Sequence, residues 1–392
     1  MKGVTPWPNW KIDCPFSVPV VDDVEEHDEK GRAAKFLADL SWFINPSRGH
    51  HVKTLWLSGR IHSDPDYDVY INVVTSLKDT LEELRIDLYM KIFNADGHEE
   101  NYSTEGDLVF KNLNKFTMCI SSYVPETFSA PWVKPWARAI KGVNAMFILS
   151  QVPLGSRFVK ELQEAGTLSY KNLREIELKC KTEDGINFLA EVNQPLKKVT
   201  IKIPLEIGEV SKFENLLKKF ALSLELLSFR VSTEGMAEKS RFALNFPYLP
   251  SLKSLDFHFG VFKKVHFCNG YDCFIKDVAR FRLSFPPLSY SRHTGDDCLD
   301  YARHLPSIRS IVVTPSLYGA EEETMFWDTY SNLIDSLLPK LGQSCRTLRN
   351  FEIPSRVEFN AETSLLRGTQ LPEIFPNVGN KWINDLREIK DD

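Results

Sequence analysis

The sequence of 392 residues has no long hydrophobic run, and no stretch approaches 18 consecutive apolar residues. A membrane-spanning helix needs about that length, so we expect no membrane partner. The first ten residues, MKGVTPWPNW, also lack the apolar segment of a secretory signal. Neither sign of charge dominates, because 48 Lys and Arg stand against 53 Asp and Glu. The chain is therefore not a general polyanion binder, although local basic patches remain open.

Cysteine is scarce and shows no pairing pattern. The seven cysteines are Cys14, Cys119, Cys180, Cys268, Cys273, Cys298 and Cys345. An odd, scattered set in a chain of this size is typical of reduced thiols rather than of a disulfide framework. We therefore expect a cytoplasmic or nuclear protein.

Motifs that carry catalysis are missing as well. The sequence contains no Gly-x-Ser-x-Gly, no phosphate-binding P-loop and no dinucleotide-binding Gly-x-Gly-x-x-Gly. We expect no cofactor and a non-catalytic protein.

Three short clusters could be drawn as chemical sites, and each has a simpler interpretation. His266, Cys268 and Cys273 offer three ligands at spacings that structural zinc does not favour, which indicates a loop with buried thiols. His50 and His51 are better explained as polar residues directly before a strand. The segment 293–298 contains His, Asp and Cys, but sequence neighbours seldom form a nucleophilic constellation, and a Gly-Asp turn before a helix explains it better. We expect no metal site.

One pattern recurs along most of the chain: an apolar residue, two variable residues, and apolar residues at the fourth and sixth positions. It starts at Val52, Leu81, Leu113, Val143, Leu173, Leu196, Leu224, Leu252, Val278, Ile308 and Leu348. A single match is expected by chance in a chain that is 43% hydrophobic. The matches are spaced almost regularly, 23 to 40 residues apart, and this spacing indicates a repeat rather than chance.

The segments between the matches show helical periodicity. One apolar stripe is formed by Phe213, Leu216, Leu217, Phe220, Ala221 and Leu224, and a second runs from Trp327 to Leu341. Alternating two-residue and 3.6-residue periods predict an α/β protein in which short parallel strands alternate with helices. An ordinary α/β domain with a doubly wound sheet also alternates them and stays open as the alternative.

The pattern resembles the leucine-rich repeat, Leu-x-x-Leu-x-Leu. Its spacing is similar to the long repeats of ribonuclease inhibitor and of F-box/leucine-rich-repeat proteins. The resemblance implies a curved, horseshoe-shaped solenoid with parallel strands on the concave face, and with helices and irregular turns on the convex face.

The chain departs from that family at two places. The family usually has Asn or Cys at the ninth position, but here it holds Arg60, Tyr89, Ser121, Gln151, Lys181, Pro204, Ser232, Gly260, Pro286, Ser316 and Arg356. In addition, no F-box is recognisable in residues 1–50, so the F-box has either been lost or lies upstream. We expect an N-terminal segment with a capping helix over 1–50, about eleven degenerate repeats over 51–356, and a C-terminal cap and tail over 357–392.

Side chains between the apolar strand positions point to the opposite face, which solenoids commonly use for binding. The predicted partner-binding residues on the concave face are Trp56, Phe147, Lys198, Lys202, Arg230, Asp256, His258, Arg280 and Arg282. The aromatic pair would serve as anchors, and the cations would suit an acidic or phosphorylated protein segment. Interspersed carboxylates make duplex nucleic acid a poor candidate.

We therefore expect a protein–protein interaction scaffold. The resemblance implies substrate recognition in an F-box-type ubiquitin ligase, with the cullin-ligase adaptor as a second partner if an F-box exists upstream. A ribonuclease-inhibitor-like regulator that occludes its partner is the alternative, followed by an enzyme.

Overall fold

The computed structural model describes a large part of the chain. The described residues are 9–13, 52–61, 64–90, 109–122, 134–150, 152–166, 170–232, 241–262, 266–268, 271–273, 280–285, 299–318, 333–334, 336–339, 343–353 and 371–379. The chain forms two compact units, Met1–Gln194 and Pro195–Asp392. Each unit is α/β. Each contains a parallel sheet in which the strands stand in the same order as in the sequence.

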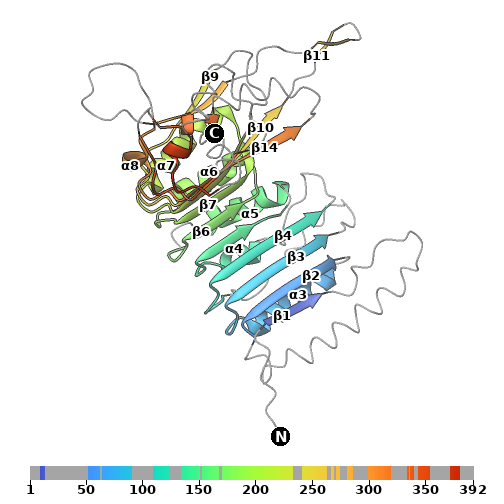
Figure 1. Ribbon diagram of the computed structural model, residues 1–392. Coiled ribbons are helices and arrows are strands. Elements are labelled where there is room, and N and C mark those ends of the chain that lie inside the picture. The colour runs from blue at the N-terminus through green and yellow to red at the C-terminus, as the bar shows by residue number, and fades with distance from the viewer. Residues whose placement is uncertain are drawn as a thin grey trace. The chain divides into compact units, whose positions relative to one another are not determined.

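The first unit contains a sheet of six parallel strands. They are β1 (Asn9–Asp13), β2 (Thr54–Ile61), β3 (Glu83–Met90), β4 (Lys115–Ser122), β5 (Ala145–Ile148) and β6 (Glu175–Leu178). Figure 1 shows strands β1 to β4 side by side. The pairing places Leu55, Leu84 and Phe116 in one row across β2, β3 and β4. These three side chains are completely buried, so the row forms the centre of the core.

In the part of this unit that the structure describes, four helices lie between or after these strands. They are α3 (Asp64–Leu77), α4 (Lys134–Ala139), α5 (Val152–Glu164) and α6 (Thr182–Glu191). The ring of Phe116 on β4 lies 6.2 Å from both Trp136 of α4 and Phe158 of α5, measured between ring centroids. The apolar side of the sheet therefore packs directly on the helices.

The second unit has five strands in its main sheet. They are β7 (Lys198–Leu205), β8 (Leu226–Ser232), β10 (Ser254–Phe262), β14 (Ser310–Tyr318) and β15 (Asn350–Glu352). Leu227, Leu255 and Ile311 lie in one row across β8, β10 and β14 and are fully buried. The prediction that Leu227 and Leu255 are interior is confirmed.

Helix α7 (Val210–Phe220) follows the short 3-10 helix η2 (Ile207–Glu209) and covers the apolar side of this sheet. Phe213 of α7 lies 5.2 Å from Phe229 of β8. The predicted apolar stripe is confirmed within the helix, where Val210, Phe213, Leu216, Leu217 and Phe220 are buried. The helix ends at Phe220, so Leu224 is buried as part of the approach to β8 rather than as part of α7.

Every predicted strand is present, and each begins two residues after the first apolar residue of its match. Val52 precedes β2 at Thr54, for example, and Leu252 precedes β10 at Ser254. Six of these strands have eight or nine residues, namely β2, β3, β4, β7, β10 and β14. The pattern therefore locates the strands along the chain.

One predicted strand lies outside the main sheet. Strand β13 (Arg280–Ser284) pairs in parallel with β9 (Arg241–Asn245) in a separate two-stranded sheet. Strand β10 instead pairs directly with β14 over nine residues, which leaves no place between them for β13. The order expected from the sequence, with the strand at Arg280 as the next rung after β10, is therefore wrong.

The β9–β13 pair packs on the helical side of the sheet. Phe246, just after β9, lies 6.1 Å from Phe229 of β8 and 5.8 Å from Phe285, just after β13. Phe285 in turn stacks on His304 of α8 (Tyr301–His304), at 5.4 Å. These aromatic contacts extend the hydrophobic core from the main sheet into the β9–β13 layer. This layer occupies the position that a helix takes between other strands.

The ends of the chain are described in part. Strand β1 pairs with β2 and was not predicted from the sequence. The predicted capping helix near residues 36–44 lies outside the described residues. Of the predicted cap at 357–392, residues 371–379 are described, and Leu371, Phe375 and Val378 are buried there.

Candidate partner-binding surfaces

Within the described residues, the helices that connect the strands leave one face of each main sheet uncovered. A parallel crossover connection is right-handed in nearly all proteins, so connections that add strands in one direction all lie on one side. Burial follows this rule: β5 and β6 alternate between half-exposed and buried residues along their whole length. We call the half-exposed side the sheet face of each unit.

In the first unit, both predicted aromatic anchors lie on the sheet face and in a single row. Trp56 pairs with Arg85, Arg85 with Thr117, and Thr117 with Phe147. Trp56 and Phe147 are therefore three strands apart, or about 14 Å. Both side chains are half-buried.

A cation lies over each aromatic ring. The guanidinium carbon of Arg85 is 4.4 Å from the ring centre of Trp56, and the Nζ atom of Lys115 is 5.7 Å from that of Phe147. Each cation is also paired with a carboxylate of β3, Arg85 with Asp87 at 3.0 Å and Lys115 with Glu83 at 2.7 Å. These contacts hold the aromatic side chains in fixed positions between charged groups.

Cys119 lies beside this cluster but is a poor nucleophile. Burial raises the pKa of its thiol, and the charge of the neighbouring Asp87 raises it further. A thiol with a raised pKa is protonated at neutral pH, whereas the thiolate is the reactive form.

In the second unit, the sheet face carries cations on β7 and β8 and carboxylates on β10 and β15. Lys198 of β7 is exposed, and Lys202 and Arg230 are half-buried. Strand β7 changes register between Thr200 and Pro204, so Lys202 lies in an irregular part of the strand. Arg230 pairs with His258 across β8 and β10. Its Nε atom is buried and makes no hydrogen bond in the structure.

Asp256 is the carboxylate on β10. Its side chain accepts a hydrogen bond from the Ser228 hydroxyl at 3.1 Å and lies 3.5 Å from Nε2 of His258. The hydrogen bond from His258 holds the pKa of Asp256 below its usual value, although burial acts in the opposite direction. The charge of His258, the hydroxyl of Ser228 and the charge of Lys202 also lower this pKa. Asp256 and His258 therefore lie together on this face, and the charge of Lys202 acts on Asp256.

Arg280 and Arg282 do not belong to this surface. Both lie on β13, which pairs with β9 in the separate two-stranded sheet. The predicted cationic group of neighbouring strands is therefore reduced to Lys198, Lys202 and Arg230. The side chains of Arg280 and Arg282 lie outside the described residues.

Three short clusters were considered above as possible chemical sites: His266 with Cys268 and Cys273, His50-His51, and the segment 293–298. Among the residues that the structure describes, no three His, Cys, Asp or Glu side chains are grouped to hold a metal ion. His266 lies opposite Cys273 in a hairpin of β11 (His266–Cys268) and β12 (Tyr271–Cys273), whose side chains are not described. Residues 50–51 and 293–298 lie outside the described residues. No helix of the described part is long and apolar enough to span a membrane.

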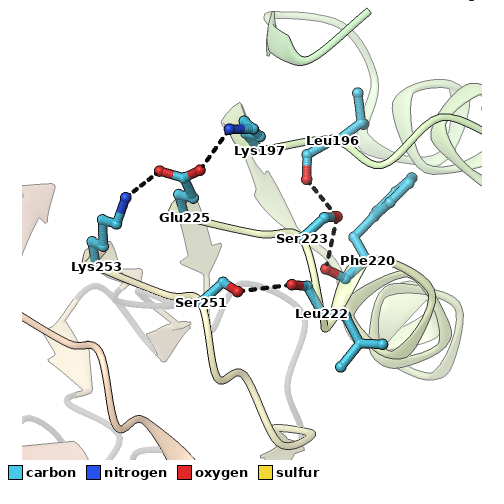
Figure 2. A network of polar contacts seen from close by, with 8 residues as sticks. All are labelled: Leu196, Lys197, Phe220, Leu222, Ser223, Glu225, Ser251 and Lys253. Carbon is cyan, nitrogen blue, oxygen red and sulfur yellow. Dashed lines mark hydrogen bonds and ion pairs between the residues drawn. The ribbon is translucent and has the colours of Figure 1, made fainter.

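Sequence reasoning missed a polar brace that precedes several strands. An Asn or Ser directly before the first apolar residue of a match donates a side-chain hydrogen bond to a carbonyl at or up to two residues before the start of the preceding match. The donors are Asn112 to Asp79, Asn172 to Gly142, Ser223 to Leu196 and Ser251 to Leu222. Figure 2 shows the last two of these braces. Their signal is visible in the sequence one residue before these four matches, rather than at the ninth position where the family carries Asn or Cys.

Comparison with known protein families, with curated proteins and with solved structures found no match for this chain.

Proposed function

We propose that this chain is a leucine-rich-repeat-type solenoid that binds another protein on the sheet face. The observation that carries the proposal is the row from Trp56 to Phe147, which holds two half-buried aromatic rings between paired charges. No described helix covers this face. Aromatic and arginine side chains in such settings are the usual energetic centres of protein interfaces.

The sheet face of the second unit supports a partner with negative charge. Its three cations, Lys198, Lys202 and Arg230, outnumber the two carboxylates that the described strands place on this face, Asp256 and Glu352. A carboxylate or phosphate group accepts strong hydrogen bonds from arginine. An acidic or phosphorylated polypeptide segment therefore fits this surface.

The proposed biological setting is substrate recognition in an F-box-type ubiquitin ligase, and it rests on the repeat resemblance. In that setting the sheet face selects the substrate and the protein has no catalytic role of its own. A partner that is bound and then ubiquitinated supports this setting. A partner that is bound and inhibited without turnover supports the occluding regulator instead.

The test compares partner capture by three proteins in cell lysate: the wild type, Lys198→Gln/Arg230→Gln on the sheet face, and Lys218→Gln/Lys219→Gln on α7. Both variants lose two positive charges in the same unit, and only the first alters the sheet face. We expect the first variant to lose specific partners, quantified by mass spectrometry, while the second retains them. Binding of each candidate is then measured with purified protein. Equal capture by all three proteins, with unchanged melting curves, would refute sheet-face binding in this unit.

A further inference from the structure

We propose that the second unit carries a separate binding strip for an acidic polypeptide along the starts of its strands. The strip consists of Lys197, Glu225, Lys253, Arg309 and Arg349, each directly before β7, β8, β10, β14 or β15. It lies at the ends of the strands, apart from the sheet-face residues named above. The proposal does not depend on the proposed function.

Backbone hydrogen bonds fix the spacing of the strip. The N–H groups of Arg309 and Ser310 both donate to the carbonyl of Lys253, at 2.8 and 3.0 Å. Those of Arg349 and Asn350 donate in the same way to Arg309. Neighbouring members are therefore one strand spacing apart, about 4.8 Å, and the five span about 19 Å.

Within the strip, two lysines already bind one carboxylate, that of Glu225. Glu225 lies between Lys197 at 3.0 Å and Lys253 at 2.5 Å, as Figure 2 shows. Hydrogen bonds from these two lysines, that of Lys253 being the stronger effect, lower the pKa of Glu225 to about 2. The Ser223 and Ser251 braces fix the turns on which Glu225 and Lys253 stand.

Beyond Lys253 the cations have no such carboxylate. Arg309 and Arg349 are exposed, and neither takes part in an ion pair among the described residues. Lys253, Arg309 and Arg349 thus place three positive charges on consecutive strands in a chain whose net charge is −5. Like charges on adjacent strands destabilise a sheet, so an acidic partner that neutralises Arg309 and Arg349 would stabilise this arrangement.

The equivalent row in the first unit provides an internal comparison. There the positions hold Lys53, Glu82, Asn114, Asn144 and Arg174. Lys53 is paired with Glu82 at 2.6 Å, and Asn144 donates to Asn114 at 3.2 Å. The five positions of the first unit therefore carry a net charge of +1, whereas the five positions of the second unit carry +3.

The chemistry favours a polypeptide over a nucleic acid. The guanidinium fork of arginine matches a carboxylate with two parallel hydrogen bonds. The five positions include no aromatic side chain for stacking on bases, which single-stranded nucleic acids generally require. An extended acidic segment of about six residues spans the same 19 Å.

The test measures fluorescence anisotropy of the full chain with three labelled probes: an eight-residue polyglutamate peptide, the corresponding polyglutamine peptide, and an eight-nucleotide single-stranded DNA. We expect the wild type to bind polyglutamate at low salt and to bind polyglutamine much more weakly. Arg309→Glu/Arg349→Glu should weaken polyglutamate binding by roughly tenfold, since two favourable pairs become unfavourable. Lys218→Glu/Lys219→Glu, with the same change of net charge on α7, should change it by less than about twofold.

A second variant, Glu225→Gln, is expected to strengthen binding, a result that misfolding would not produce. Glu225→Gln removes the one carboxylate of the strip, so it should strengthen polyglutamate binding by roughly two- to fivefold. Melting curves verify that each variant is folded. Equal losses in the two double variants, or no tightening by Glu225→Gln, would overturn the proposal. Tighter binding of the DNA, lost in Arg309→Glu/Arg349→Glu, would replace the acidic polypeptide by a nucleic acid.

Discussion

Leu255 lies in the interior of the second unit, in the middle of its main sheet. It is fully buried and lies between Leu227 and Ile311 in the sheet. Leu255→Asp buries an unpaired charge, which costs more than about 4 kcal/mol and removes much of a typical stability of 5 to 15 kcal/mol. We expect this variant to be unfolded at 25 °C by circular dichroism. Ser254→Asp introduces the same side chain on the half-exposed face and should shift the stability by less than about 1 kcal/mol.

Glu225 gives a second prediction at this scale. Its pKa in the folded protein is about 2, below the ordinary 4.5, because Lys253 and Lys197 hydrogen-bond to the ionised carboxylate. A lowered pKa stabilises the folded state above about pH 4.5, and that contribution is lost as the pH falls towards 2. The difference in Tm between wild type and Glu225→Gln should therefore shrink over this range. In a Lys253→Met background the same difference should be smaller at every pH, and an unchanged difference would contradict this account.

At the scale of elements, the packing of α5 on the chain after β6 is tightest at Gly155. A Cβ atom at this position would lie 2.2 Å from the carbonyl oxygen of Lys179. Replacing a helix glycine by alanine normally stabilises a protein by up to about 1 kcal/mol. Here we expect Gly155→Ala to destabilise it by about 1 to 3 kcal/mol or more, because helix and strand must separate.

Gly142 provides the matched control, because a Cβ atom there has nothing within 4 Å. Gly142→Ala should leave the denaturation midpoint within about 0.5 kcal/mol of the wild type. Chemical denaturation of both variants measures the difference. A Gly155→Ala variant as stable as Gly142→Ala would show that α5 does not approach Lys179 so closely.

The elements also show what the sequence could and could not predict. Apolar spacing located the strands because buried positions such as Leu55 and Leu84 must recur in register. It could not tell that β13 leaves the main sheet, since Leu283 is buried there just as Leu255 is in the ladder. Burial alone does not identify the strand's neighbours. Strand β1 was missed although Trp7, Trp10 and Ile12 fit the apolar spacing, because this match starts 45 residues before Val52, outside the spacing of the other matches.

The candidate site was predicted in part for the same reason. Alternation placed Trp56, Phe147 and Asp256 on the sheet face, and pairing across strands then brought Asp256 to His258 and Ser228. The ion pairs of Arg85 and Lys115 depend on rotamers and on register, which no single strand specifies.

At the scale of the whole molecule, strand order decides which cations act together. Lys198→Gln/Arg230→Gln should weaken binding of an acidic partner at low salt, with a smaller effect at high salt, where charges are screened. The double reversal Arg280→Glu/Arg282→Glu lies on β13 and should have the smaller effect, despite its larger change of charge. Titration of one purified partner at two salt concentrations compares them. A larger loss in the β13 variant would contradict the assignment of the site to the main sheet.

The central claim is that partners bind on the sheet face, and cysteine labelling with and without a bound partner tests it most directly. Cysteines are introduced singly at Ser254 and Ser310 on the sheet face and at Ser211 on α7, and mass spectrometry of the peptides separates them from the native thiols. The account predicts that the partner slows labelling at positions 254 and 310 and leaves position 211 unchanged. Protection at position 211, with free labelling at positions 254 and 310, would contradict it.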